Sequence, residues 1–220
     1  MVYKINEINN LKHNINMEER KLNEKESLEL ITQMIQNSKK NLQVGGGNQF
    51  ILWGWLGAIT SLVVMGMLIW TKNPMWNWLW FAIPVIGWPV MMWQLKKVEK
   101  PVVTFTDKVL KATWMTIGSI GMFSIFLMAM YAHNSHLIIP GTILLVGIGS
   151  AITGAVLDNK RLQSWVSGVF GFAMIVSIRI AFDDTNPIWN HIVFSIAFIG
   201  MLAIPGHILN KEAKNYVQRT

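Results

Sequence analysis

The sequence contains no cysteine among its 220 residues. This absence excludes disulfide bonds, thiolate metal sites and cysteine nucleophiles together. Charged residues are also scarce, at 14%, whereas soluble domains carry about a quarter. Hydrophobic residues make up 52% of the chain, and the mean hydropathy is +0.36. Few charges and many apolar residues together indicate an integral membrane protein.

Enzyme signatures are missing as well. The sequence has no HExxH or GxSxG motif. The acidic residues after position 107 all lie at predicted membrane edges: Asp158, Asp183, Asp184 and Glu212. Proton-coupled transporters and membrane hydrolases need carboxylates inside the membrane, so both classes are disfavoured. The sequence therefore predicts no catalytic residue, no cofactor and no enzymatic activity.

Long stretches without charge dominate the remainder of the chain. No charged residue occurs from Trp114 to Ser135 or from His136 to Leu157. Such runs are long enough to cross a hydrocarbon layer about 30 Å thick. We expect an all-α polytopic membrane protein with six transmembrane helices in three hairpins, at about 49–70, 76–95, 109–131, 137–157, 164–182 and 188–209. The fifth is the weakest, because it is the shortest and contains Arg179.

The distribution of Lys and Arg orients these spans. The N-terminal tail, the segment 96–111, the turn near 159–163 and the C-terminal tail hold seventeen of them, and the alternate connections hold only Lys72 and Arg179. The positive-inside rule then places both termini in the cytoplasm. The net charge of +7 is explained by this topology, and no nucleic-acid partner is expected. The lipid bilayer is the predicted environment.

The polar N-terminal segment 1–48 precedes the first span, and no cleavable signal peptide of ordinary form is expected. Within it, residues 23–42 have the pattern of an amphipathic cytoplasmic helix, in which Leu28, Ile31, Ile35 and Leu42 share one stripe. We expect Gly45-Gly46-Gly47 to end this helix. The transmembrane domain would cover 49–209, and 210–220 would form a cytoplasmic tail.

An internal repeat links two of the expected spans. Residues 73–87 (NPMWNWLWFAIPVIG) and 186–200 (NPIWNHIVFSIAFIG) are identical at eight of fifteen positions without a gap. The shared NPxWN motif comprises Asn73, Pro74, Trp76 and Asn77 in one copy and Asn186, Pro187, Trp189 and Asn190 in the other. Asn is a favoured helix cap, Pro suits the first turn, and Trp prefers the membrane interface. The motif therefore favours a structural role at the outer interface over ligand contact.

Charged and imidazole side chains supply the remaining candidates for a site. Arg179 precedes Asp183 by four residues, so the two either pair at the interface or Arg179 contacts an anion or lipid headgroup. His133, His136 and His191 fall near the outer face. Surface histidines are the favoured interpretation, and a metal site built from these imidazoles is the alternative.

The stretch ESLELITQMIQNSKKNLQVGGGNQFILWGW, Glu26 to Trp55, resembles the start of a family of bacterial multi-pass membrane proteins. The resemblance covers about thirty residues. It implies a short cytoplasmic helix followed by several transmembrane spans in the bacterial cytoplasmic membrane. It implies no activity and no site residues.

Two functions fit this sequence. The favoured one is a non-enzymatic sensory, regulatory or scaffolding membrane component that binds a cytoplasmic protein or the membrane surface through residues 23–42. The alternative is a small-solute or ion transporter or channel, suggested by the repeated hairpins, by Arg179 and by Pro84, Pro89 and Pro205 within spans. The sequence leaves a homo-oligomer open.

Overall fold

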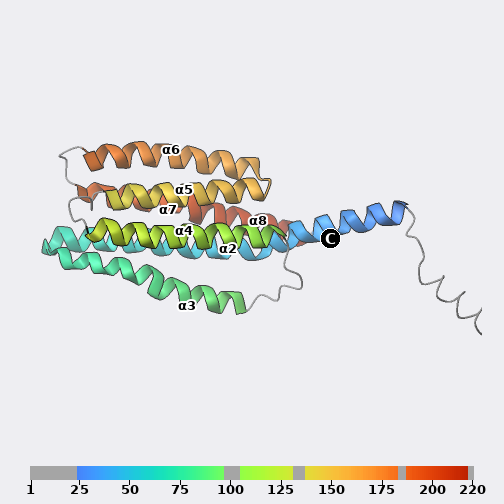
Figure 1. The fold of residues 1–220 in the computed structure, drawn as a ribbon, viewed down its shortest axis with the longest axis horizontal. Helices are drawn as coiled ribbons and strands as arrows, with labels where there is room; N and C mark the ends of the chain where they lie inside the picture. Colours follow the sequence, from blue (N-terminus) through green and yellow to red (C-terminus); the bar gives the residue numbers. More distant parts are fainter. Residues whose placement is uncertain (1–23, 97–104, 131–136, 183–186, 218–220) are drawn as a thin grey trace, which may run out of the picture. The chain divides into compact units, whose positions relative to one another are not determined.

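A computed structural model describes residues 24–96, 105–130, 137–182 and 187–217, and these are helical apart from short turns (Figure 1). The helices are α2 (Glu24–Thr71), η1 (Pro74–Phe81), α3 (Ala82–Lys96), α4 (Phe105–Met130), α5 (Ile138–Val156), α6 (Lys160–Phe182), η3 (Pro187–Trp189), α7 (Asn190–Phe198), η4 (Ile199–Ala203) and α8 (Ile204–Val217). The predicted all-α class is confirmed. The chain divides into two compact units, 1–38 and 39–220, which are described separately.

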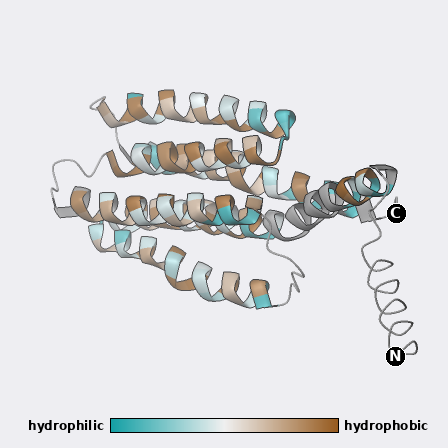
Figure 2. Cartoon of the chain, turned by 45° about the vertical axis from the view of Figure 1, so that its right-hand side comes forward, coloured by the Kyte–Doolittle hydropathy of each residue, from teal (hydrophilic) through white to brown (hydrophobic). Residues whose placement is uncertain are grey.

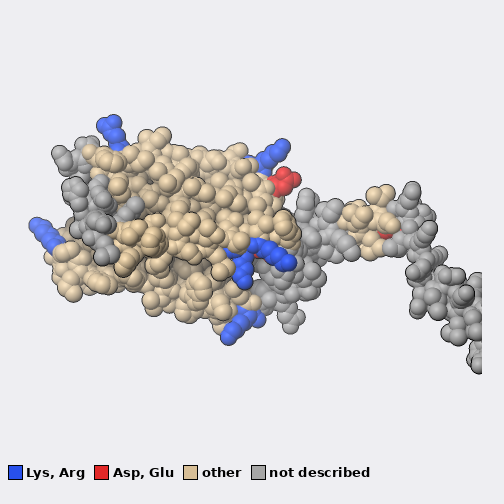
Figure 3. Space-filling view, in the orientation of Figure 1, with Lys and Arg blue, Asp and Glu red and all other residues tan. Residues whose placement is uncertain are grey.

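Among the residues that the structure describes, five helical segments are long and apolar enough to cross a membrane: Gly47–Thr71, Pro74–Lys96, Ile138–Val156, Lys160–Phe182 and Asn190–Glu212. The chain is therefore a membrane protein with several candidate spans. The segment predicted to be weakest is among the five, and its Arg179 lies in the last turn of α6. Helix α4 is not among them. Figure 2 shows long hydrophobic stretches along these helices, and Figure 3 shows Lys and Arg at the two ends of the second unit with uncharged surface between them.

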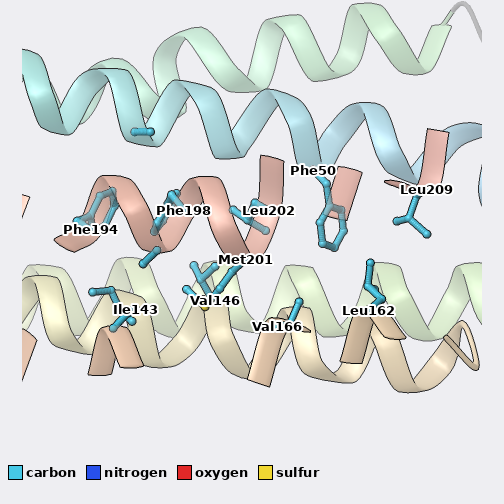
Figure 4. Packing of buried hydrophobic residues seen from close by; sticks show 13 residues of the cluster. Phe50, Ile143, Val146, Leu162, Val166, Phe194, Phe198, Met201, Leu202 and Leu209 are labelled. Atoms are coloured by element: carbon cyan, nitrogen blue, oxygen red, sulfur yellow. The ribbon is translucent and has the colours of Figure 1, made fainter. Parts of the chain in front are cut away.

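The last segment, Asn190–Glu212, is the most buried of the five, at 61%, and Pro74–Lys96 is the least, at 6%. The central position of Asn190–Glu212 follows from the composition of this segment, because its large apolar residues face several neighbouring helices at once. Figure 4 shows its Phe194, Phe198, Met201 and Leu202 in the same cluster as side chains from α5 and α6. All four are buried. This packed apolar cluster is the core of the second unit.

Helix α2 runs antiparallel to α7 and α8, and glycines set how closely they approach. A Cβ on Gly54 would lie 2.5 Å from the backbone nitrogen of Ala203, and one on Gly206 would lie 2.6 Å from the carbonyl oxygen of Gly47. A Cβ on Gly57 would meet the Phe198 ring. Small residues that let two backbones touch are the usual basis of helix association in membranes.

The expected end of the cytoplasmic helix at Gly45-Gly46-Gly47 is wrong, because α2 continues through these residues to Thr71. Glycine in a helix costs only about 1 kcal/mol relative to alanine, so tertiary contacts can override the propensity. Gly47 has such a contact, since a Cβ there would collide with the side chain of Asn210 and the backbone of Gly206. In the sequence, Gly47 predicts the end of a helix. In the fold, it lets α2 and α8 approach each other closely.

Polar side chains join the helices at the opposite end from the α7 start. Asn210 donates its Nδ2–H to Oδ1 of Asn48 at 2.7 Å, which links α8 to α2. Asn159 caps α6 by accepting from the Leu162 amide at 3.0 Å, and its Nδ2–H reaches Oε2 of Glu212 at 3.1 Å. The turn between α5 and α6 is thereby tied to α8.

Pro205 changes the helix before it, as its missing N–H requires. Residues Ile199–Ala203 form a π-helical turn, closed by the Ile204 amide on the Ile199 carbonyl. The next bond of that pattern would come from residue 205, which has no N–H to give. The freed Gly200 carbonyl instead accepts the Trp165 indole N–H from α6 at 3.0 Å. Neighbouring helices commonly satisfy carbonyls freed by proline in membranes.

Trp165→Phe tests this bond. The substitution keeps most of the ring but leaves the Gly200 carbonyl without its donor, so we expect a loss of about 1 kcal/mol in the free energy of unfolding in detergent micelles. Trp88→Phe is the matched control, because Trp88 is 59% exposed on α3. Equal stabilities of the two variants would contradict the assignment.

Candidate functional site

A group of buried polar side chains lies where α7 begins. It comprises Ser61 of α2 and Asn190, His191 and Ser195 of α7, and we call it the α7 polar cluster. The exposed fractions run from 0% for Ser61 to 8% for His191. Trp80 of η1 packs beside it, with its ring centroid 5.8 Å from that of His191. The consecutive elements α2 and η1 therefore meet α7, which is far along the sequence, at this place.

The two serine hydroxyls hold α2 against α7. Ser61 Oγ donates to the His191 carbonyl at 3.0 Å. Ser195 Oγ lies 3.1 Å from the Ala58 carbonyl and 2.9 Å from the His191 carbonyl, which it reaches within its own helix. Each hydroxyl has a single proton, so both donors are used on backbone carbonyls.

The other two polar side chains carry buried atoms that make no geometric hydrogen bond to a described residue. Oδ1 of Asn190 and both ring nitrogens of His191 make no hydrogen bond to any residue that the structure describes. The backbone of Ile188 interacts with the imidazole, but without the geometry of a hydrogen bond. A buried polar group left unpaired costs about 1–3 kcal/mol. Imidazole inside a membrane bundle is rare and marks functional positions more often than packing.

The predicted surface location of His191 is wrong, since only 8% of this residue is exposed. Its position in the sequence placed it correctly near a helix start but could not give the direction of the side chain. The segment Asn190–Glu212 carries most of the cluster, and it is the most buried of the five candidate spans. One sequence difference could have indicated that His191 is buried. His191 stands at the position that Trp78 occupies in the other NPxWN segment.

The NPxWN motif has different surroundings in its two copies. In the first, Asn73 caps η1 by accepting from the Met75 amide at 2.9 Å, as predicted, and exposed Asn77 donates to the Pro74 carbonyl at 3.1 Å. In the second, Asn190 is buried, and Trp189 is 56% exposed. Asn186 lies outside the described residues. The capping role is therefore confirmed for the first copy only.

The other candidates are separated from the α7 polar cluster or outside the described chain. Arg179 is exposed in the last turn of α6. Its expected partner Asp183, together with His133 and His136, lies outside the described residues, so the ion pair and the three-histidine metal site stay predictions. Within the described ranges, no group of three or more His, Asp or Glu side chains could hold a metal ion.

Comparison with known proteins adds no relative to this picture. No family model, no curated protein and no solved structure matches the chain. The resemblance over residues 26–55 therefore stays a prediction. The class that the fold defines is a helical membrane protein in which a central, π-interrupted helix carries a buried polar cluster at its first turn.

Proposed function

We propose that this protein is a non-enzymatic regulatory membrane component that binds a cytoplasmic protein partner through its N-terminal helix. The observation that supports this role is the exposed apolar surface within residues 26–33. On the predicted stripe, Leu28 is 64% exposed and Ile31 53%. In water, a helix that exposes such residues gains free energy by covering them.

Ile31→Asp tests the proposal. A charge on the apolar stripe should reduce cross-linking of the helix to its partner in cells at least tenfold, because it would have to be desolvated in the interface. Gln33→Asp adds the same charge at an exposed position on the opposite side of the helix and should have no effect. Deleting residues 1–44 should abolish partner cross-linking and leave membrane insertion intact. Unchanged cross-linking in Ile31→Asp and in the deletion would contradict the proposal.

We also propose that α4 is a sixth span. Its 26 residues extend about 39 Å as a helix, and it carries no charge from Ala112 to Met130. It packs antiparallel along α5, which is a candidate span: the Trp114 indole donates to Thr153 Oγ1 at 3.1 Å, and further along Gly121 faces Leu145. A helix that packs along a transmembrane helix over such a length lies at the same depth in the bilayer as that helix.

The six spans place both termini on one side, and the excess of Lys and Arg in the connections on that side supports a cytoplasmic location. The start of α7 then lies at the outer face. A bacterial cytoplasmic membrane is the location that the resemblance over residues 26–55 suggests.

The first and third hairpins are proposed to be related repeats. Gly87 and Gly200 match in the sequence repeat, and both contact the helix that precedes them in the chain. A Cβ on Gly87 would lie 2.6 Å from Trp53 and 3.1 Å from Leu56, and one on Gly200 would lie 2.7 Å from Val169. Leu56 and Val169 are separated by the same 113 residues as the glycines. The Gly87–Leu56 contact and the Gly200–Val169 contact are thus related by the same shift in residue number.

Transport of a small solute is a second candidate, favoured by the unbonded Asn190 Oδ1 and His191 ring nitrogens and by the π-helical turn before Pro205. The apolar cluster that fills the middle of the second unit opposes it, because it closes the path beyond Phe194. Regulation therefore remains the function that the described residues support best.

A further inference from the structure

The α7 polar cluster contains hydrogen-bonding capacity that the protein itself does not use. Asn190 Oδ1 is an acceptor, and a neutral imidazole offers one donor and one acceptor. These three atoms belong to side chains that are 2% and 8% exposed, and none makes a geometric hydrogen bond to a described residue, although the Ile188 backbone interacts with the imidazole. The nearby hydroxyls cannot donate to them, because Ser61 and Ser195 donate to backbone carbonyls.

The surroundings of the cluster favour an uncharged occupant. Its described neighbours are the Trp80 ring, the Phe194 ring packed against Trp80 at 5.0 Å, and the two serines. The described charged residues at this end of the bundle, Lys72 and Arg179, are both exposed. A polar occupant without charge would therefore fit, and water is the smallest molecule that both donates and accepts. Buried waters typically make about three hydrogen bonds to such groups.

The position of the cluster indicates from which side water would enter. Asn190 and His191 form the first turn of α7, directly after Trp189, which is 56% exposed. In the opposite direction along the helix, Phe194 stacks on Phe198 at 4.0 Å, and Ala197 and Met201 are fully buried. The apolar core thus blocks water from one side. The end of the bundle where α7 begins remains as the side from which water would enter.

We propose that the first turn of α7 and Trp80 form a hydrated site, open to the aqueous phase at this end of the bundle, in which water and small uncharged hydrophilic molecules bind Asn190 and His191. The site is independent of the N-terminal helix and of the function proposed for it. It extends the polar surface of the outer face, in the orientation proposed above, inward to His191.

The absence of cysteine makes the site directly testable, because a single introduced thiol is the only one in the chain. Asn190→Cys and His191→Cys would be treated in sealed vesicles with a membrane-impermeant, uncharged sugar-linked methanethiosulfonate, added to each side separately. The reagent reacts with the thiolate, which forms in water and is suppressed in apolar surroundings. Ala197→Cys, seven residues beyond Asn190 and 0% exposed, is the buried control, and Trp189→Cys is the exposed one.

If the site is hydrated, the thiols of Asn190→Cys and His191→Cys should react at least tenfold faster than the thiol of the buried control. They should react only from the side on which the exposed control reacts. Rates in both variants as slow as that of the buried control would overturn the proposal.

Because each of these substitutions removes one of the polar groups, the unsubstituted protein provides the deciding measurement. In bilayers, magnetisation from water should reach the His191 imidazole nitrogens in solid-state NMR, with the signal assigned by its loss in H191Q. No transfer to that signal would show a dry imidazole and refute the site.

Discussion

Gly54→Ala is expected to destabilise the protein by about 3 kcal/mol, although alanine is the better helix former. The new Cβ would lie 2.5 Å from the Ala203 nitrogen and 3.0 Å from its Cα. Those are backbone atoms in the middle of the central helix, so no side-chain rotation can relieve the overlap, and α2 and α7–α8 must separate. The measurement is the free energy of unfolding in detergent micelles.

Gly66→Ala is the matched control on the same helix. Nothing lies within 4 Å of a Cβ at Gly66, so the substitution should be neutral or stabilise by up to about 1 kcal/mol through helix propensity. The two variants carry the same chemical change and are expected to differ in sign. A neutral Gly54→Ala would mean that α2 does not approach α7–α8 as closely as the structure shows.

Phe194→Ala is expected to cost about 3–5 kcal/mol in the free energy of unfolding. The Phe194 ring is 2% exposed, stacks on Phe198 at 4.0 Å and meets Trp80 edge-on at 5.0 Å. Its removal leaves a cavity in the central cluster and also withdraws the apolar wall next to the α7 polar cluster.

The matched control is Phe81→Ala, at the position that corresponds to Phe194 in the repeat. Phe81 is 55% exposed, and its described ring contact is with exposed Trp78. We expect a loss below about 1 kcal/mol, because no buried cavity forms. Similar losses at the two positions would contradict the central placement of Asn190–Glu212 relative to Pro74–Lys96.

The extent of the helices could be predicted because charge and hydropathy act locally. The spans expected at 76–95 and 137–157 correspond to Pro74–Lys96 and Ile138–Val156. Proline positions also carried usable information, since Pro205 directly follows a π-helical turn. Hydropathy and proline position both depend on properties that a residue has within its own helix.

The relation between helices could not be predicted in the same way. Gly47 predicts a helix stop, yet the contact with Gly206 that explains it comes from a residue far along the chain. Trp165 has the character of an interface anchor, and 47% of it is exposed, but its N–H serves a carbonyl freed by a proline on another helix. Such roles emerge only once the partners lie side by side.

The same limit applies to the candidate site. The sequence singled out His191 as one of three outer histidines but predicted a surface location for it. Its burial depends on which helix is central, and the sequence similarity between residues 73–87 and 186–200 does not distinguish these two segments. Asn77 and Asn190 occupy equivalent positions in the motif, yet one is exposed and the other is 2% exposed.

The six-span topology with both termini in the cytoplasm is tested most directly on either side of α4. Val103→Cys and Asn134→Cys each place a single thiol in a connection that flanks this helix. In right-side-out vesicles, an impermeant maleimide should label the Asn134→Cys variant and leave the Val103→Cys variant unlabelled until the membrane is permeabilised. Labelling of both variants, or of neither, before permeabilisation would show that α4 does not cross. Labelling of the Val103→Cys variant alone would show that the orientation is reversed.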